Sequence, residues 1–293
     1  MWTFSMEVVG RKTNSLLAVS IVATMNLAEL RLIVTDMDGT LLDGDRQLPR
    51  HFQSIVKGLS SRGIDWVIAS GRQFENLFKQ FNQIETSPAI IAENGALVYE
   101  CGETLPFFSD LTPVLFFADV LREALAVDEA TVVLCGQEVA LVSDLYLDNF
   151  EAVSHYFSNS LLWHKVSDVA ERSICKVAVY HPAAAKVLWP RLAPFANETL
   201  RVILSSPHWI DIQPMRINKG HALSAFMARR GVRPDQVMVF GDYLNDVEMM
   251  TLGVHAVAMG NAHPDLRACC PYSTRANTDD GVMWYLRHAG VLR

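Results

Sequence analysis

Short apolar runs of strand length alternate with segments of helical periodicity over much of the chain. The runs lack the polar alternation of a half-exposed strand, which indicates strands buried on both faces, as in a parallel sheet. Between them, apolar residues recur at helical spacing in Pro49–Leu59, Phe74–Phe81 and Lys219–Arg230. This alternation of strand and helix predicts an α/β fold. The apolar runs are Leu32–Val34, Asp65–Ala69, Ala89–Ala92, Val237–Phe240 and Val254–Met259.

Two aspartates stand directly after the first apolar run, within Leu30–Asp43. Asp36 and Asp38 are two residues apart, so in an extended backbone both face the same side. Open α/β sheets bind ligands beyond the carboxyl ends of their strands. Two carboxylates there favour an oxygen-preferring cation such as Mg²⁺, and Gly39 permits a tight turn over them. Taken alone, the motif Asp36–Gly39 also fits an ordinary polar turn.

Small polar or acidic groups follow two further apolar runs. Asp65–Ala69 is followed by Ser70 and Gly71, and Val237–Phe240 is followed by Gly241 and Asp242. If the strands are parallel, these groups meet at one edge of the sheet. The recurrence favours a functional site over an ordinary turn.

The alternation of single strands and helices ends in the middle of the chain. Short turns join the strands expected there, which indicates an antiparallel sheet with helices on one face. A helix followed by two strands occurs twice, so this block is predicted to be an inserted α+β domain. The expected helices are Val114–Leu125, Asp144–Phe157 and Pro182–Phe195, and the expected strands are Thr131–Leu134, Glu138–Val142, Ile174–Tyr180, Arg201–Leu204 and Trp209–Ile212.

Four short motifs appear in a fixed order: DMDGTLLD, ASGR, NKGHAL and GDYLND. In this order they resemble the motifs of the haloacid dehalogenase superfamily, and most of all its Cof-like, class IIB phosphatases. The resemblance extends from about Leu27 to the C-terminus. It implies a Rossmann-like, doubly wound parallel sheet as the core, at 25–108 and 213–293. The inserted α+β block at 109–212 matches the cap domain of that family.

The resemblance implies a role for each acidic residue. Asp36 is the nucleophile that forms an aspartyl-phosphate, and Asp38 is the general acid and base. The implied Mg²⁺ ligands are Asp36, the backbone carbonyl of Asp38, and Asp242. Asp246 is the second acid of the last motif, acting on the metal through water or by holding Lys219.

Five residues are expected to bind the phosphoryl group. Ser70 offers a hydroxyl, while Gly71 and Met37 offer backbone N–H groups. Lys219 stands at a helix N-terminus, where its charge and the helix dipole both favour an anion. Asn245 can donate an amide hydrogen. Singly, such residues are more often structural; the four ordered motifs together favour the functional interpretation.

The predicted function is an Mg²⁺-dependent phosphatase for small phosphorylated metabolites, sugar phosphates first. A phosphotransferase or phosphomutase could use the same aspartyl-phosphate, so only the products distinguish the two. A phospho-accepting signalling module would also be doubly wound and acidic, but it needs no cap. A glycosyltransferase with an Asp-x-Asp motif leaves Ser70, Lys219 and Asp242 unexplained.

The composition limits the kinds of binding partner that can be expected. The net charge is −7, which argues against a nucleic-acid-binding surface. The five cysteines are odd in number and form no C-x-x-C pair, so reduced thiols and a cytoplasmic location are expected. The histidines show no zinc-binding spacing. No membrane partner is expected, and the sequence does not indicate an oligomeric state.

The first 24 residues are the one atypical segment. Arg11 and Lys12 precede the apolar run Leu16–Ala23, an outline that a signal peptide also has. The run is too short to cross a membrane. We favour a dispensable extension with translation from Met25, because the family resemblance begins just after that residue.

A chain that starts at Met25 is therefore expected to keep its melting temperature and activity. Thermal unfolding and turnover of the shortened and complete chains test this directly. A large fall in either quantity would contradict the start at Met25.

Overall fold

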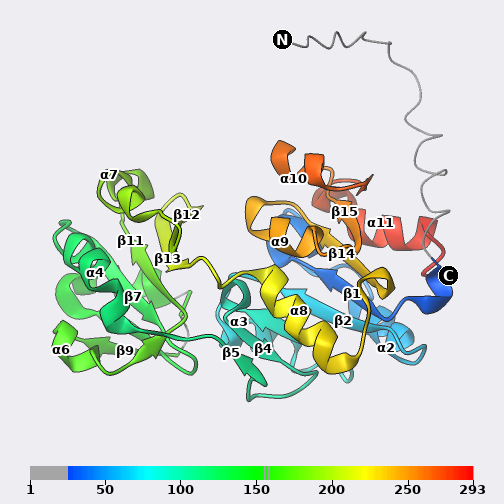
Figure 1. Cartoon of the computed structure of the whole chain (residues 1–293), viewed down its shortest axis with the longest axis horizontal. Helices are drawn as coiled ribbons and strands as arrows, with labels where there is room; N and C mark the ends of the chain where they lie inside the picture. The colour runs from blue at the N-terminus through cyan, green and yellow to red at the C-terminus, as the bar shows by residue number, and fades with distance from the viewer. Residues whose placement is uncertain (1–25, 155, 158, 293) are drawn as a thin grey trace, which may run out of the picture.

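The computed structural model describes residues 26–154, 156–157 and 159–292. The predicted N-terminal extension, residues 1–24, lies outside the described residues. Two sheets with their helices stand next to each other, and the chain passes from the first to the second and back again (Figure 1).

The larger sheet has eight strands in the order β16-β15-β14-β1-β2-β3-β4-β5. The pairs from β16 to β3 are parallel, while β4 and β5 are added antiparallel at one edge. This confirms the predicted parallel sheet. Its strands are β1 (Leu32–Thr35), β2 (Asp65–Ala69), β3 (Ala89–Ala92), β4 (Leu97–Tyr99), β5 (Phe108–Ser109), β14 (Val237–Gly241), β15 (His255–Ala258) and β16 (Tyr272–Ser273).

The central strand β1 is buried on both faces between β14 and β2. Its one polar side chain, Thr35, accepts a hydrogen bond from Trp66 Nε1 at 3.0 Å, which satisfies both buried polar groups. The apolar run seen in the sequence is thus explained by helices that cover both faces of the sheet.

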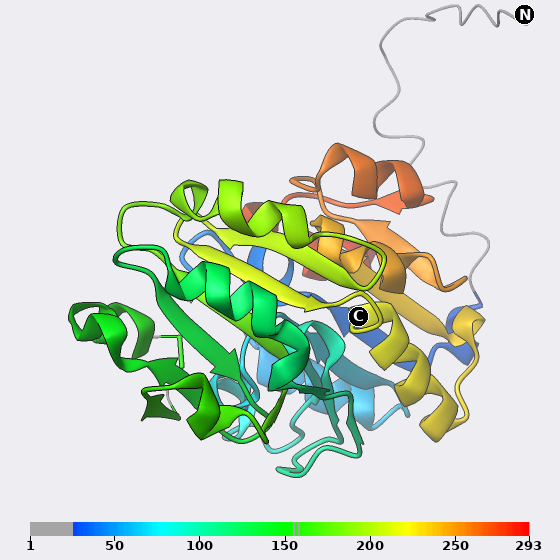
Figure 2. The same cartoon turned by 60° about the vertical axis from the view of Figure 1, so that its left-hand side comes forward.

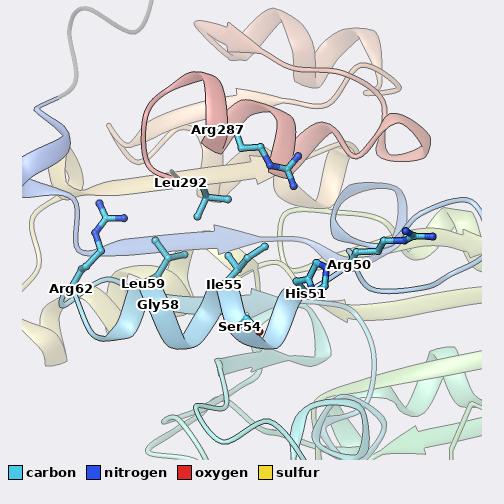
Figure 3. Close-up of a pocket in the computed structure, with 9 residues that line it drawn as sticks. All are labelled: Arg50, His51, Ser54, Ile55, Gly58, Leu59, Arg62, Arg287 and Leu292. Atoms are coloured by element: carbon cyan, nitrogen blue, oxygen red, sulfur yellow. The ribbon is translucent and has the colours of Figure 1, made fainter.

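Helices lie on both faces of this sheet, as in a doubly wound fold. The helices α8 and α9 pack together on one face, while α2 and α11 lie on the other (Figures 1 and 3). Between α2 and α11 runs a groove of about 720 Å³, lined in part by Arg50, Arg62 and Arg287, which shares no residue with the predicted site. The helices are α2 (Phe52–Ser60), α3 (Phe74–Phe81), α8 (Lys219–Arg230), α9 (Val247–Met250), α10 (Pro264–Cys269) and α11 (Gly281–His288).

The second sheet has the order β12-β13-β11-β7-β8-β9, and all of its pairs except β8–β9 are antiparallel. Helices α4 (Ala118–Leu125) and α7 (Trp189–Leu192) pack on one face. The prediction of helices on one face only was wrong, because Val153 of the short helix that follows β8 packs on the opposite face. A separate pair, β6 (Thr112–Pro113) and β10 (Ser173–Ile174), lies beside it. The strands are β7 (Thr131–Cys135), β8 (Ala140–Ser143), β9 (Ser160–Trp163), β11 (Lys176–Tyr180), β12 (Leu200–Ser206) and β13 (Trp209–Pro214).

Two predicted helices of this region are much shorter in the structure. Within 144–157 only α5 (Phe150–Ser154) is an α-helix, and the parallel edge strand β9 follows it. Within 182–195, α7 has four residues. Pro190 and Pro194 lack the backbone N–H that a continuous helix needs, which explains the interruption. The short α6 (Val166–Val169) was not expected either.

The second sheet lies across the core and covers part of it in the view of Figure 2. The predicted domain limits, 108/109 and 212/213, fall within β5 and β13, and the limits remain a prediction. Among the described residues, no helix has both the length and the apolar character needed to cross a membrane.

Candidate active site

The first acidic motif forms a tight turn at the carboxyl end of β1. The backbone N–H of Asp36 still donates to Phe240 O of β14 at 3.1 Å, and the chain then turns through Gly39 at φ +80°. A Cβ atom at Gly39 would lie 2.3 Å from an Asp242 oxygen. Only glycine therefore permits both this backbone conformation and this approach.

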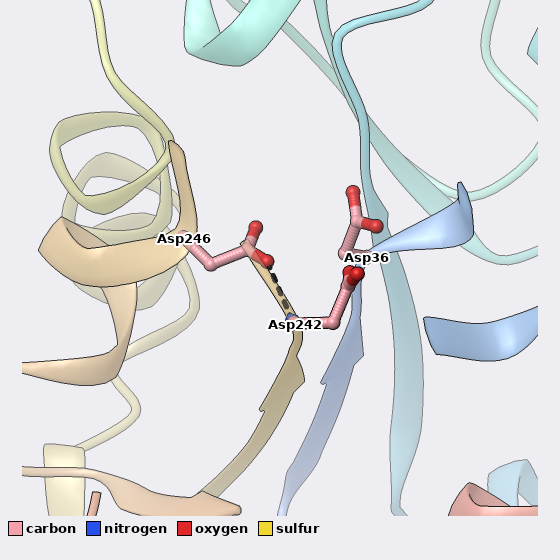
Figure 4. A group of neighbouring side chains, drawn as sticks. All are labelled: Asp36, Asp242 and Asp246. Atoms are coloured by element: carbon pink, nitrogen blue, oxygen red, sulfur yellow. Dashed lines mark hydrogen bonds between the residues drawn. The ribbon is translucent and has the colours of Figure 1, made fainter. Parts of the chain in front are cut away.

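Three carboxylates meet at this point (Figure 4). Asp36, Asp242 and Asp246 each offer an oxygen, and these oxygens lie within 4.8 Å of one another. Asp36 and Asp246 are buried, and Asp242 is partly buried. The prediction that the first and last motifs converge on one edge of the sheet therefore agrees with the geometry. Thr40 Oγ1 donates to Asp242 Oδ1 at 2.9 Å and orients it.

Lys219 is the positive charge of this cluster. Its fully buried Nζ donates to Asp36 Oδ1 at 2.5 Å and to Asp246 Oδ1 at 2.7 Å. Lys219 opens α8, where the Asn218 side chain caps the helix by accepting the His221 N–H at 2.8 Å. The other oxygen of Asp246 accepts the backbone N–H of Asp242 at 3.0 Å, so Asp246 holds both the lysine and its own loop.

The electrostatics of the cluster favour a cation. Burial raises the pKa of Asp36 well above its ordinary value, although Lys219 acts against this rise. Burial, with Asp246 nearby, raises the pKa of Asp242 to about 6. Burial alone would lower the pKa of Lys219, but Asp246 and Asp36 outweigh it and raise that pKa. One lysine faces three carboxylates, and such an oxygen donor set fits Mg²⁺.

Asp38 lies apart from the three carboxylates. Its side chain is half exposed and accepts two hydrogen bonds from Arg72, from Nε at 2.8 Å and from Nη2 at 2.5 Å. This bidentate pair orients the carboxylate. The predicted metal contact of Asp38 through its backbone carbonyl remains a prediction.

The predicted phosphate-binding groups lie around a loop after β2. Ser70 is buried, and its Oγ accepts the Arg72 N–H at 3.2 Å. Gly71 lies so close to Asn94 that a Cβ atom would come within 2.9 Å of Asn94 Oδ1. The same Oδ1 accepts a hydrogen bond from Asn245 Nδ2 at 3.2 Å, so Asn245 is joined to this loop. Met37 is buried in the turn after Asp36, and its predicted N–H contact with phosphate remains a prediction.

Sequence reasoning left three supporting residues without a role. Arg72 pairs with Asp38, Asn94 joins Asn245 to the loop, and Asn261 Nδ2 donates to Gly39 O at 2.8 Å. Each follows the carboxyl end of a strand of the parallel sheet, which is the same signal that identified the predicted site. Their partners depend on the arrangement of loops, which the sequence alone does not specify.

The comparisons with known proteins agree with this geometry. A family model of haloacid dehalogenase-like hydrolases matches residues 33–286. The 5-amino-6-(5-phospho-D-ribitylamino)uracil phosphatase of Escherichia coli is 28% identical over 259 residues, which cover 87% of this chain and 94% of that protein. The HMP-PP phosphatase of Cronobacter sakazakii is 28% identical over 248 residues, covering 83% and 88%.

Solved structures show the same fold. A Streptococcus mutans protein superposes with a TM-score of 0.76 at 23% identity, covering 90% of this chain and all of that one. A haloacid dehalogenase-like hydrolase of Bacillus subtilis gives 0.72 at 20% identity, with the same coverage. The predicted family and the predicted α/β core with an inserted cap are thereby confirmed.

Proposed function

The chain belongs to the haloacid dehalogenase-like hydrolase family and is a phosphoric monoester hydrolase, and we propose that it cleaves small phosphorylated metabolites through an aspartyl-phosphate on Asp36. One observation carries this proposal: the buried Asp36 carboxylate is held by Lys219 beside Asp242 and Asp246. A carboxylate fixed in this way can attack a phosphorus atom in line.

The first step transfers the phosphoryl group to the enzyme. An oxygen of Asp36 forms a bond to phosphorus, the bond to the leaving oxygen breaks, and Asp38 gives that oxygen a proton. Ser70, Asn245 and the Gly71 N–H are proposed to bind the phosphoryl oxygens. Such donors act where negative charge accumulates in the transition state.

The second step frees the enzyme. Asp38, now ionised, accepts a proton from a water molecule that attacks phosphorus, and the bond to Asp36 breaks. A Mg²⁺ ion held by Asp36, Asp242 and Asp246 would reduce the repulsion between carboxylate and phosphate. Lys219 keeps the Asp36 carboxylate in place through both steps.

Sugar phosphates remain the first proposed substrates. The name of the Escherichia coli relative specifies a phosphate ester on a ribityl chain, which supports a polyhydroxylated leaving group. Phosphate release from a panel of hexose phosphates, ribityl phosphates, flavin mononucleotide, pyridoxal phosphate and nucleotides tests the proposal. If no phosphate monoester is hydrolysed with Mg²⁺ present, the proposal is wrong.

Two alternatives share the nucleophile and are separated by their products. A phosphotransferase or phosphomutase would pass the phosphoryl group to a second hydroxyl group, so phosphate release would trail substrate loss. A signalling module would hold the aspartyl-phosphate without turnover. The second sheet across the core favours an enzyme, since a signalling module needs no cover over its site. A cytoplasmic location remains a prediction.

Asp38→Asn is expected to slow sugar phosphate hydrolysis about 100-fold or more, since general acid–base catalysis contributes about 10²–10⁴-fold. The rate of the first step on p-nitrophenyl phosphate should fall less, because p-nitrophenolate leaves with little protonation. Hydrolysis of the aspartyl-phosphate then lacks its base, so stopped-flow absorbance should show a burst of p-nitrophenolate before slow turnover.

The matched control is Asp45→Asn, which neutralises an exposed carboxylate in the same loop. It should keep wild-type rates on both substrates. Equal losses on the sugar phosphate and on p-nitrophenyl phosphate, without a burst, would contradict the assigned role of Asp38.

A further inference from the structure

A buried ionic cluster joins the two sheets beside the candidate active site. The Nζ atom of Lys176, on β11, lies 2.9 Å from Asp211 Oδ2 on β13. The same Nζ lies 3.0 Å from Oε2 of Glu93, a core residue that directly follows β3. The exposed fractions of the three residues are 5%, 6% and 1%. The cluster therefore includes charges from both sheets and is shielded from water only while the sheets are together.

Burial of these charges needs an explanation, because the transfer of charges from water into a protein costs free energy. Lys176 stands in the otherwise apolar strand β11, and two carboxylates share its single positive charge. Burial raises the pKa of Glu93, with Lys176 acting against the rise. Replacement of such groups by apolar ones is often neutral or stabilising, so stability alone does not account for the cluster.

Lys176 makes one further contact, and this contact reaches the phosphate loop. Its Nζ donates to the carbonyl oxygen of Gly71 at 3.0 Å. Gly71 is the residue whose N–H is proposed to bind a phosphoryl oxygen, and it follows Ser70 directly. A side chain of the cap thus fixes one face of a peptide unit next to the phosphate site.

The partner segment of this loop has an unusual backbone. Glu93 and Asn94 have φ values of 52° and 56°, a region that residues other than glycine seldom adopt. Their N–H groups donate to Arg72 O at 3.1 Å and to Ser70 O at 2.9 Å. The ion pair between Glu93 and Lys176 therefore helps to hold a strained turn that pairs with the phosphate loop.

Two further contacts join strands of the second sheet to the core. Asn94 Nδ2 donates to Gln213 Oε1 of β13 at 3.3 Å, and Arg201 of β12 forms a salt bridge with Glu248 of α9. In the view of Figure 2 the second sheet lies in front of part of the core.

We propose that Lys176 is a positioning residue that couples the seating of the cap to the geometry of the Ser70–Gly71 phosphate loop. The proposal rests on the proposed phosphatase function. When the cap is seated, Lys176 holds Gly71 and the turn at Glu93 in the arrangement that binds phosphate. When the cap moves away, the loop loses both contacts and its phosphate donors lose their alignment.

Lys176→Met keeps the length of the side chain and removes its charge. The inhibition constant of inorganic phosphate should rise about tenfold and kcat/KM should fall about tenfold or more, since displacements near 1 Å have effects up to about 10². Hydrogen exchange of the backbone amides in 68–76 and 90–96 should become faster. The control Lys186→Met removes an exposed lysine from the same cap and should change none of these quantities.

A triple variant separates positioning from stability. Lys176→Met combined with Glu93→Gln and Asp211→Asn removes the carboxylates that the single variant leaves unpaired. It should regain melting temperature but keep the weak phosphate inhibition and the fast exchange at Gly71. Lys176→Arg, which retains the charge, should recover part of the phosphate inhibition and part of the slow exchange at Gly71.

Two results would overturn the proposal. One is a folded Lys176→Met variant with wild-type phosphate inhibition and exchange. The other is a triple variant in which melting temperature and phosphate inhibition recover together, which would show a purely structural role. Hydrogen exchange requires no turnover, so this part of the test stands even if the wild-type protein hydrolyses no phosphate ester and the proposed function fails.

Discussion

Asp36→Asn is expected to lower turnover by about 10⁴-fold or more, because the loss of one member of a catalytic unit removes nearly the whole effect. The amide keeps the size of the carboxylate but is a far weaker nucleophile. Steady-state rates on the best substrate of the panel measure the loss. No burst of p-nitrophenolate should accompany it, in contrast to the Asp38 variant.

The fold should survive this substitution. Burial raises the pKa of Asp36 because a buried charge is costly, and Lys219 keeps its ion pair with Asp246 when Asp36 becomes an amide. Asp119→Asn, in an exposed position of α4, is the control and should keep full activity. An Asp36→Asn variant with a cooperative thermal transition and more than about a tenth of wild-type turnover would contradict the nucleophilic role.

Withdrawal of divalent cations is the second large expected effect. Activity should vanish in the presence of a chelator and return with Mg²⁺, without any need for zinc, because the three side chains that meet at the site are all carboxylates. Full activity in thoroughly metal-stripped protein would exclude the proposed cofactor.

The same cluster predicts how Mg²⁺ stabilisation depends on pH. The pKa of Asp242 is about 6 in the folded protein against an ordinary value of 3.8, so the metal-free fold loses stability as pH rises through this interval. A cation replaces the lost proton. At about 100 times its Kd it stabilises by about 2.7 kcal/mol. Melting temperatures should show a larger gain from Mg²⁺ at pH 7.5 than at pH 5, and Asp242→Asn should reduce this gain.

The core was predictable because its strands are buried on both faces. Apolar runs such as Leu32–Val34, separated by helices, indicate the strands of a parallel sheet. Parallel strands bring their carboxyl ends to one edge of that sheet. That rule alone placed Asp36 near Asp242. The motif order then added Lys219, which the structure joins to Asp36 and Asp246.

The cap was less predictable because its elements are short and partly exposed. The edge strand β9 leaves Leu161 and Leu162 more than half exposed, so its sequence carries no burial pattern. Asp38 was predicted as an acid, but its pairing with Arg72 depends on the path of two loops. The role of Lys176 was not predictable because two of its partners, Glu93 and Gly71, belong to the core, and no local pattern specifies how two sheets dock.

The stereochemistry at phosphorus tests the central claim most directly. A phosphorothioate ester made chiral with oxygen-16 and oxygen-18 is hydrolysed in oxygen-17 water, and the configuration of the released thiophosphate is determined. Attack by Asp36 followed by attack of water on phosphorus inverts the centre twice, so we predict net retention. Net inversion would show a single displacement at phosphorus and would contradict an aspartyl-phosphate that water hydrolyses at phosphorus.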